Sequence, residues 1–285
     1  MRSRVTVDYR WANEPVCLER IVTLPLEQIE ITETVRAYHR ESLVRSLYQR
    51  KDRTGEYAWP ESAFGASYFQ MAGLALDVLA PDRDFDLVVF VTATPDCQLT
   101  HYSAPQFNEA LPGRPGFIGI GDQGAAGPFT AVRIVRNHLR FGLVERAIIL
   151  IMEQALIPQT PDRLWVPRDS AVALVLSRRG GLVLGSEAIS RNSAIRLPPG
   201  GSEESVLIQG NGMTETDFAA PGARFAQVWR PDGDYACTGV WETLASRLPQ
   251  LRHNRVVLAE ADQTLSYRSF LELTRPAGDD IVMSH

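Results

Sequence analysis

The sequence predicts an α/β fold made of two halves, in which strands and helices alternate along the chain. Continuous apolar runs rich in β-branched residues occur at Leu87–Thr94 and Arg146–Met152, as expected of strands buried on both faces of a sheet. Between these runs, residues 126–141 place apolar side chains at helical spacing. A helix followed by two strands occurs again near the end of the sequence, so the second half repeats the pattern of the first.

In the first half, a helix is expected over residues 63–80, where apolar side chains recur at helical spacing before the turn-forming letters APDRDFD. The helix over residues 126–141 carries Pro128 in its first turn, where a missing N–H costs little, and Gly142 follows it as a stop. The strands of this half are expected at Leu87–Thr94, Phe117–Ile120, Arg146–Met152 and Ser170–Leu176.

In the second half, a helix is expected over Val240–Leu248, which ends before Pro249. Strands are expected at Arg255–Leu258 and Leu265–Leu273, whereas residues 196–217 are rich in Gly, Ser, Pro and Asn and indicate mostly loop. The pattern divides the chain into an N-terminal segment over 1–62, in which residues 29–50 could be helical, a first half over 63–180 and a shortened second half over 181–285.

Composition excludes several classes of partner and site. The chain has 285 residues, 45% of them hydrophobic, and a net charge of −5, so it carries no basic surface for a nucleic acid. Its three cysteines, Cys17, Cys97 and Cys237, lie far apart without metal-ligand spacing, so neither a disulfide framework nor a metal site is expected. The sequence lacks a signal-peptide pattern and any apolar run long enough to span a membrane, which predicts a cytoplasmic protein without membrane contact.

The segment GFIGIGDQGAAGPFTAV, residues 116–132, holds glycines in the order G-x-G-x-x-G between a strand and a helix. A dinucleotide-binding turn also needs an acidic residue about 20 positions further on, at the end of the next strand. Glu145 lies before that strand and Glu153 lies too far along it. An NAD-binding Rossmann protein therefore stays an alternative, and no cofactor is expected.

Residues 117–153 resemble the nucleophile elbow of the β-ketoacyl-ACP synthase III branch of the thiolase superfamily. The elbow of that family consists of a strand, the letters A-C-A/S-G, a long helix and a hydrophobic strand ending in an acid. Here the letters GAAG (124–127), PFTAVRIVRNHLRFG and LVERAIILIME match it without a gap. Upstream DLVVFVTATPDC and downstream RDSAVALVL also match, so the resemblance covers residues 65–180 well and 236–273 loosely.

The resemblance implies a thiolase-like fold of two βαβ-type halves whose second half is abbreviated. It also implies that the catalytic cysteine, which the helix N-terminus activates in relatives, is replaced by Ala125. The family's H-x-A-N and N-T-S segments are absent, and EADQT (Glu260–Thr264) stands in place of its glycine-rich loop. No catalytic residue is therefore expected.

By the same resemblance, the residues around Ala125 form the elbow and border an acyl pocket: Asp122, Gln123, Gly124 and Gly127. Gln123 does not stand at the cysteine position, unlike the glutamine of some ketosynthase loading domains. Cys97 is expected to be a structural or surface thiol, Cys237 a structural cysteine, and Asp169 a capping or turn residue. The strand Phe117, Ile118, Gly119 and Ile120 is expected at a dimer interface, with the loop Gln98–Gln106 near the acyl pocket of the partner.

The expected function is that of a noncatalytic subunit, which completes and shapes an active partner that condenses acyl thioesters. The partner would be a Cys-bearing ketosynthase III-like homologue or a second copy, and acyl-CoA or acyl-ACP would bind through the partner. Inactive subunits of bacterial 2-alkyl-4-quinolone synthases and chain-length factors of polyketide systems are similar. Two alternatives remain open besides the NAD-binding one: a stand-alone acyltransferase or decarboxylase without a cysteine nucleophile, and an acyl- or CoA-binding regulatory protein.

Overall fold

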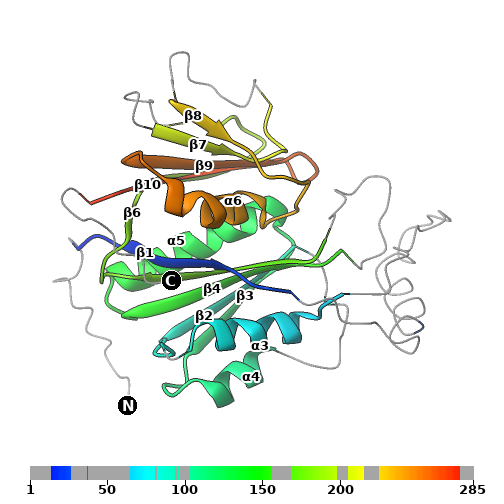
Figure 1. Ribbon diagram of the computed structural model, residues 1–285, viewed down its shortest axis with the longest axis vertical. Helices are drawn as coiled ribbons and strands as arrows, with labels where there is room; N and C mark the ends of the chain where they lie inside the picture. Colours follow the sequence, from blue (N-terminus) through cyan, green and yellow to red (C-terminus); the bar gives the residue numbers. More distant parts are fainter. Residues whose placement is uncertain are drawn as a thin grey trace.

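The computed structural model describes residues 14–26, 37, 65–80, 82–93, 96, 103–155, 168–197, 205–214 and 225–276. In this part of the chain, strands form a 10-stranded sheet in the order β3-β2-β4-β5-β1-β6-β10-β9-β7-β8, which folds into two layers (Figure 1). The helix expected over 29–50 lies outside the described residues, apart from the helical residue Ala37.

Five strands form the first half of the sheet. β1 (Cys17–Thr23) pairs antiparallel with β5 (Ser170–Ser177), and β5 pairs antiparallel with β4 (Arg146–Glu153). β4 then pairs parallel with β2 (Leu87–Thr92), which pairs parallel with the edge strand β3 (Gly116–Ile120). The four strands predicted for this half are confirmed, and β1 is a fifth that the sequence pattern did not reveal.

The second half repeats this arrangement strand for strand. β6 (Leu182–Arg191) pairs antiparallel with β10 (Tyr267–Thr274), and β10 with β9 (Arg255–Asp262). β9 then pairs parallel with β7 (Ser205–Gln209), which pairs parallel with β8 (Gln227–Trp229). Strands β1 to β5 therefore correspond in order and direction to β6 to β10, and the predicted repeat is confirmed.

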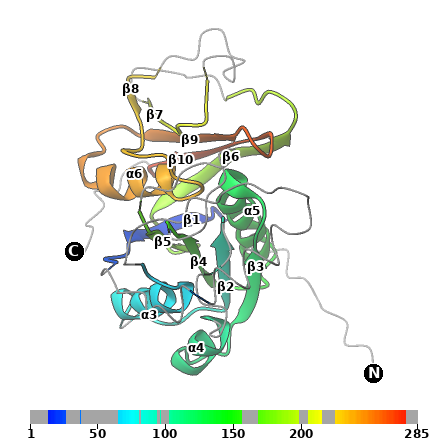
Figure 2. The same cartoon turned by 90° about the vertical axis from the view of Figure 1, so that its right-hand side faces the viewer.

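Two helices lie between the sheets and two lie outside. α5 (Gly127–Arg140) and α6 (Gly239–Arg247) fill the middle layer, while α3 (Tyr68–Val78) and α4 (Ser103–Ala110) cover the outer face of the first sheet (Figure 2). Short 3-10 turns, η3 (Gly124–Ala126) and η5 (Leu248–Gln250), adjoin the two middle helices. The three predicted helices in this region are confirmed, and α4 is an additional one.

Helix α3 begins later than the sequence spacing predicts because a capping box sets its first turn. The side chain of Ser67 accepts a hydrogen bond from the N–H of Gln70, and the Gln70 side chain accepts one from the N–H of Ser67. The expected start at residue 63 is therefore too early.

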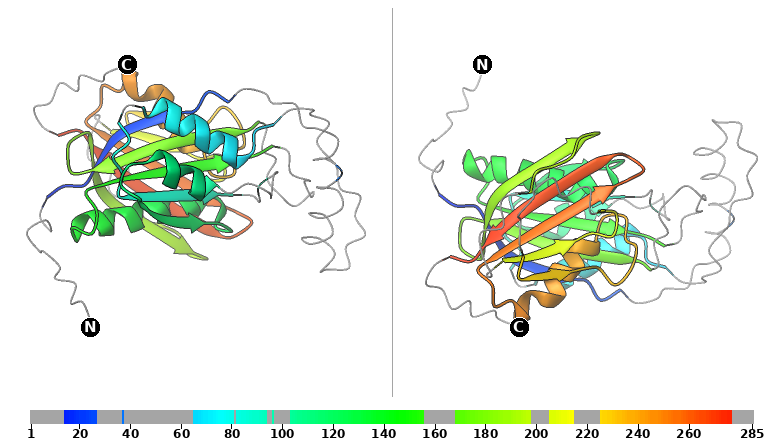
Figure 3. Two further views of the ribbon diagram at one scale, coloured as in Figure 1. Left: turned by 90° about the horizontal axis from the view of Figure 1, so that it is seen from below. Right: turned by 90° about the horizontal axis from the view of Figure 1, so that it is seen from above.

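Among the described residues, the outer crossover of the second half contains no helix. Residues 192–204 alone join β6 to β7, and their described part, 192–197, runs over the outer face of the second sheet (Figure 3). Ile195 and Leu197 are buried there against Leu207 and Val257. The described residues 192–197 thus pack as an irregular segment on a face whose counterpart in the first half carries α3 and α4.

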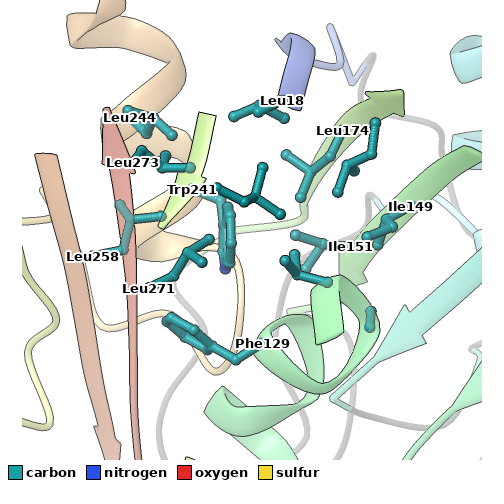
Figure 4. Close-up of a cluster of buried hydrophobic side chains, with 14 of the residues drawn as sticks. Leu18, Phe129, Ile149, Ile151, Leu174, Trp241, Leu244, Leu258, Leu271 and Leu273 are labelled. Atoms are coloured by element: carbon teal, nitrogen blue, oxygen red, sulfur yellow. The ribbon is translucent and has the colours of Figure 1, made fainter. Parts of the chain in front are cut away.

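The largest core lies between the two sheets, and one aromatic pair marks its centre. Phe129 on α5 and Trp241 on α6 lie with ring centroids 5.3 Å apart, among leucines and isoleucines from both sheets (Figure 4). Both rings occupy the third residue of their helix, so they are equivalent positions of the repeat. One shared core therefore holds the halves together.

The missed strands are either partly exposed or short. β6 exposes part of its length, and only the pairs Cys17–Val183 and Leu18–Leu182 join it to β1. β7 is fully buried but short, and it lies inside the Gly- and Ser-rich region expected to be loop. The expectation of loop over residues 196–217 is wrong at 205–209.

Within the described residues, none of the helices is long and apolar enough to cross a membrane.

Candidate functional site

The glycine-rich stretch forms a strand-to-helix elbow at the carboxyl end of β3. After Ile120 the chain turns through Asp122, whose φ is 57°, and Gly124, whose φ is 49°, before it enters η3 and α5. Gly127 brings the first turn of α5 close to β2, since a Cβ at this position would lie 2.9 Å from Val91 Cγ1. The predicted elbow is thus present, with Ala125 in its 3-10 turn.

Ala125 is buried at the elbow, with 6% of its surface exposed. Its backbone N–H donates a hydrogen bond to Asp262 Oδ2 over 3.3 Å. The same carboxylate leaves no room for a side chain at Gly124, because a Cβ there would overlap Asp262 Oδ2. A glycine is therefore required at position 124 both by its backbone conformation and by the approach of Asp262.

Asp262 is the last residue of β9 and turns the chain toward β10. Its Oδ1 accepts a hydrogen bond from the N–H of Leu265 over 2.8 Å, which fixes the carboxylate in a tight turn. The segment Glu260–Thr264, expected to stand in place of the family's glycine-rich loop, therefore contacts the elbow through Asp262.

The other elbow side chains are held locally or face solvent. Gln123 Oε1 accepts a hydrogen bond from Thr130 Oγ1 over 2.6 Å, so the amide is tied to the first turns of α5. Asp122 is exposed. Ala125 itself presents only a methyl group.

A second site lies at the N-terminus of α6, close to the elbow, and the carboxyl group of Glu153 occupies it. Glu153 ends β4, has no exposed surface, and accepts hydrogen bonds from the N–H groups of Ala236 (2.7 Å), Cys237 (2.9 Å) and Thr238 (3.3 Å). The hydroxyl of Thr238 donates another. Burial raises the pKa of Glu153 to about 7, although these hydrogen bonds act in the opposite direction.

Cys237 is held at this same helix end but is not activated. Its thiol is buried and donates to the carbonyl of Met152 over 3.8 Å. Burial, and next the charge of Glu153, raise the pKa of the thiol well above its ordinary value. A thiolate is the reactive form of cysteine, so the expectation of a structural Cys237 agrees with its surroundings.

Glu260 adds a third carboxyl group to this region. It is buried two residues before Asp262 and accepts a hydrogen bond from the N–H of Ala261 over 3.0 Å, while Gly210 packs so closely that a Cβ there would overlap the carboxyl group. Burial raises the pKa of Glu260 to about 8, and the charges of Asp262 and Glu153 also raise it. The sequence reasoning missed this role for Glu153 and Glu260; the only signal was an acid at or near the end of an apolar strand.

Asp169 serves a structural role at the entrance to β5, as expected. Its carboxylate accepts hydrogen bonds from the N–H of Ala66 (2.6 Å) and the N–H of Ala155 (2.8 Å). Burial raises the pKa of Asp169, and the two N–H groups lower it. The contacts tie the segment before α3 to the end of β4.

The expected interface strand lies at the edge of the sheet. In β3, Gly116 and Gly119 are exposed, Phe117 and Ile118 are half-buried, and Ile120 is buried. The Phe117 ring stacks on Phe90 at 6.2 Å.

The loop expected over Gln98–Gln106 needs a correction, because residues 103–106 belong to helix α4. Cys97 and residues 98–102 lie outside the described residues. Among the residues that are described, no group of three or more His, Cys, Asp or Glu side chains is arranged to hold a metal ion.

The arrangement of strands distinguishes the elbow from a dinucleotide-binding turn. A Rossmann domain is built on a mostly parallel, doubly wound sheet. Here each half contains two antiparallel pairings among its five strands, in the order shared by both halves. The glycines of residues 116–132 therefore shape the turn of a different α/β fold.

Comparison with solved structures identifies that fold. The chain is similar to 3-oxoacyl-(acyl carrier protein) synthase III, FabH, from Pseudomonas aeruginosa, with a TM-score of 0.58 and 16% identity over 92% of this chain and 98% of that one. It is also similar to OleA from Xanthomonas campestris with bound lauric acid and lauroyl-CoA, with a TM-score of 0.55 and 12% identity over 92% and 99% of the chains. The acyltransferase ChlB3 gives a TM-score of 0.60 and 13% identity over 92% and 98%.

These likenesses establish a thiolase-like fold of the kind found in FabH and OleA. No protein-family model and no curated protein matches the chain by sequence. The fold class predicted from the sequence is confirmed.

Proposed function

We propose that this chain is a noncatalytic ketosynthase III-like subunit that completes and shapes an active partner condensing acyl thioesters. One observation carries the proposal: in a thiolase-like fold, the elbow presents the methyl group of Ala125, and its N–H is bound to Asp262. Covalent acyl transfer needs a nucleophile at this turn, and a methyl group cannot attack a thioester.

The described cysteines do not supply a substitute nucleophile. Cys237 is buried at the N-terminus of α6, and its pKa is raised by burial and by Glu153. Cys17 is buried on β1, and its pKa is also raised by burial. Both groups therefore stay protonated and weakly nucleophilic at neutral pH.

The partner would bind along β3. An edge strand carries unpaired backbone groups, and pairing across a two-fold or pseudo-two-fold axis removes them. Exposed Gly119 and half-buried Phe117 and Ile118 let another strand approach closely. A Cys-bearing ketosynthase III-like homologue fits this edge best, with a second copy of this chain as the homodimeric form.

In this assembly the acyl thioester, whether acyl-CoA or acyl-ACP, binds through the active partner. The pair would act in the cytoplasm, in fatty-acyl or secondary-metabolite biosynthesis. The half-buried apolar strand β3 supports a large interface, of the class that buries above about 2,000 Å² in obligate complexes.

Co-expression with an intact ketosynthase III-like homologue, followed by light scattering, tests the assembly. We expect a one-to-one complex that Ile118→Lys disrupts, because a lysine buried without a counter-charge costs several kcal/mol, about 3 or more. Val228→Lys, on the edge strand β8 where the side chain is 50% exposed, is the matched control and should leave the complex intact. A monomer that is unchanged by the homologue and by Ile118→Lys would contradict the subunit proposal.

A further inference from the structure

Each half of the fold supplies one carboxylate that binds the N-terminal end of the middle helix of the other half. Glu153 is the last residue of β4 and Asp262 is the last residue of the equivalent strand β9. Glu153, from the first half, binds the N-terminus of α6, which belongs to the second half. Asp262, from the second half, binds the turn that leads into α5, which belongs to the first half.

Helix N-termini attract anions because their first N–H groups lack partners within the helix and the helix dipole is positive there. In this fold both such ends point into the region where β4 and β9 finish. A carboxylate of the chain itself stands at each end, so the places where an anionic group of a ligand would bind are occupied from within.

We propose that Asp262 acts as an internal stopper, by which we mean a side chain that fills the anion position at the elbow. Its carboxylate accepts the Ala125 N–H and places a negative charge beside position 125. The proposal rests on the proposed function only in taking residues 121–127 as the nucleophile elbow. It goes beyond the proposed function because it names the group that occupies the elbow where no acyl group is bound.

The two carboxylates differ in how firmly they are held. Glu153 is fully buried and accepts three backbone N–H groups and one hydroxyl. Asp262 is half-buried and accepts the N–H groups of Ala125 and Leu265. Glu153 is therefore a permanent structural cap, whereas Asp262 sits on a turn and can be replaced with less disturbance of the fold.

A thiol introduced at the elbow reports on the stopper. A carboxylate in contact with a thiol disfavours the thiolate, while a free helix N-terminus favours it. In the Ala125→Cys variant we expect slow alkylation by iodoacetamide. In the Ala125→Cys/Asp262→Asn double variant, the same thiol should react at least about tenfold faster at neutral pH, because the charge is lost while the side-chain shape is kept.

Asp122 provides the matched control. It is an exposed aspartate at the same turn with a φ of 57°, a conformation that asparagine also tolerates. Ala125→Cys/Asp122→Asn should react at the rate of the single variant. The native Cys237 serves as a fold reporter, since it should remain unlabelled in every variant that keeps the core intact.

Three results would overturn the stopper. These are equal rates with and without Asp262→Asn, no labelling of the introduced thiol in either variant, or an equal acceleration by Asp122→Asn. If Asp262→Asn makes Cys237 accessible to labelling, the Asp262→Ser variant replaces it in the test. Serine retains an acceptor for the Leu265 N–H, and the same alkylation rates are then compared. The proposed function fails separately, through acylation of the wild-type chain or failure to pair with the homologue, and neither depends on these rates.

Discussion

The backbone N–H of Ala125 donates a hydrogen bond to the carboxylate of Asp262, 137 residues further along the chain. This contact joins the elbow of the first half to the end of a strand in the second half. It places a carboxylate beside the first turn that leads into α5. A methyl group and a carboxylate therefore stand at this turn, as the proposed noncatalytic role requires.

The buried carboxyl groups predict a fold that loses stability as the pH rises. The pKa values of Glu153 and Glu260 are raised to about 7 and about 8 in the folded chain, from an ordinary value of 4.5. The folded state then binds more protons than the unfolded state above about pH 4.5, up to about pH 7 through Glu153 and up to about pH 8 through Glu260. The free energy of unfolding therefore falls with rising pH, by about 1 kcal/mol per pH unit for each group within its own window. Denaturant titrations across this range measure the slope.

The Glu260→Gln variant tests whether this pH dependence of stability comes from the buried carboxyl group or from the overall charge of the protein. The amide keeps the shape of the side chain and cannot ionise, so the upper part of the slope, toward about pH 8, should flatten. Glu145→Gln, at an exposed side chain, should leave the slope as in the wild type. A stability that rises with pH in the wild type would show that the buried carboxyl groups are ionised in the fold and would contradict their raised pKa values.

The core between the sheets predicts a strong dependence on Trp241. Trp241→Ala should lower the free energy of unfolding by about 3–5 kcal/mol, because the ring that meets Phe129 is lost and a cavity remains. Trp241→Phe should cost much less, since it keeps an aromatic ring and removes an indole N–H that has no hydrogen-bond partner among the described residues. Leu143→Ala, at a side chain that is 52% exposed, is the control and should change stability by less than about 0.5 kcal/mol.

The two described cysteines should be inert in the native chain. Cys17 and Cys237 are buried, and burial raises the pKa of each thiol. Peptide mapping after brief iodoacetamide treatment should find both unmodified under native conditions and modified in denaturant. Native labelling of Cys237 would mean that the N-terminus of α6 opens, and would reopen its candidacy as a nucleophile.

The elbow should not bind a dinucleotide. The anion position at the start of α5 is held by Asp262, and neither Glu145 nor Glu153 has the spacing of an acid that binds a ribose. Titration with NADH, followed by its fluorescence, should show no saturable binding below about millimolar concentration, equivalent to about −4 kcal/mol. Micromolar affinity would contradict the assignment of the glycines to a thiolase-type turn.

The strands buried on both faces could be predicted from the sequence because their composition alone identifies them. All eight residues of β4 are buried, as are all eight of β5, so both appear as unbroken apolar runs. Helix α5 was predictable because its buried side chains recur with the helical period. β1, β6 and β8 expose part of their surface and β7 is short, so the same criterion did not find them.

The site was predictable only where it depends on local sequence. The position of Ala125 at a helix start follows from the turn and helix signals around it. The roles of Glu153 and Asp262 do not, because each acts on a helix more than 80 residues away in sequence. That Glu153 and Asp262 occupy equivalent positions follows only from the strand order, in which β4 and β9 correspond to each other in the two halves of the repeat.

Intact-protein mass spectrometry after incubation with octanoyl-CoA measures whether this chain can carry an acyl group. We expect no covalent acyl adduct on this chain alone, and in the complex with the Cys-bearing homologue an adduct on the homologue only. Hydroxylamine-sensitive acylation of the wild-type chain without a partner would show that it is an acyltransferase in its own right and not a noncatalytic subunit.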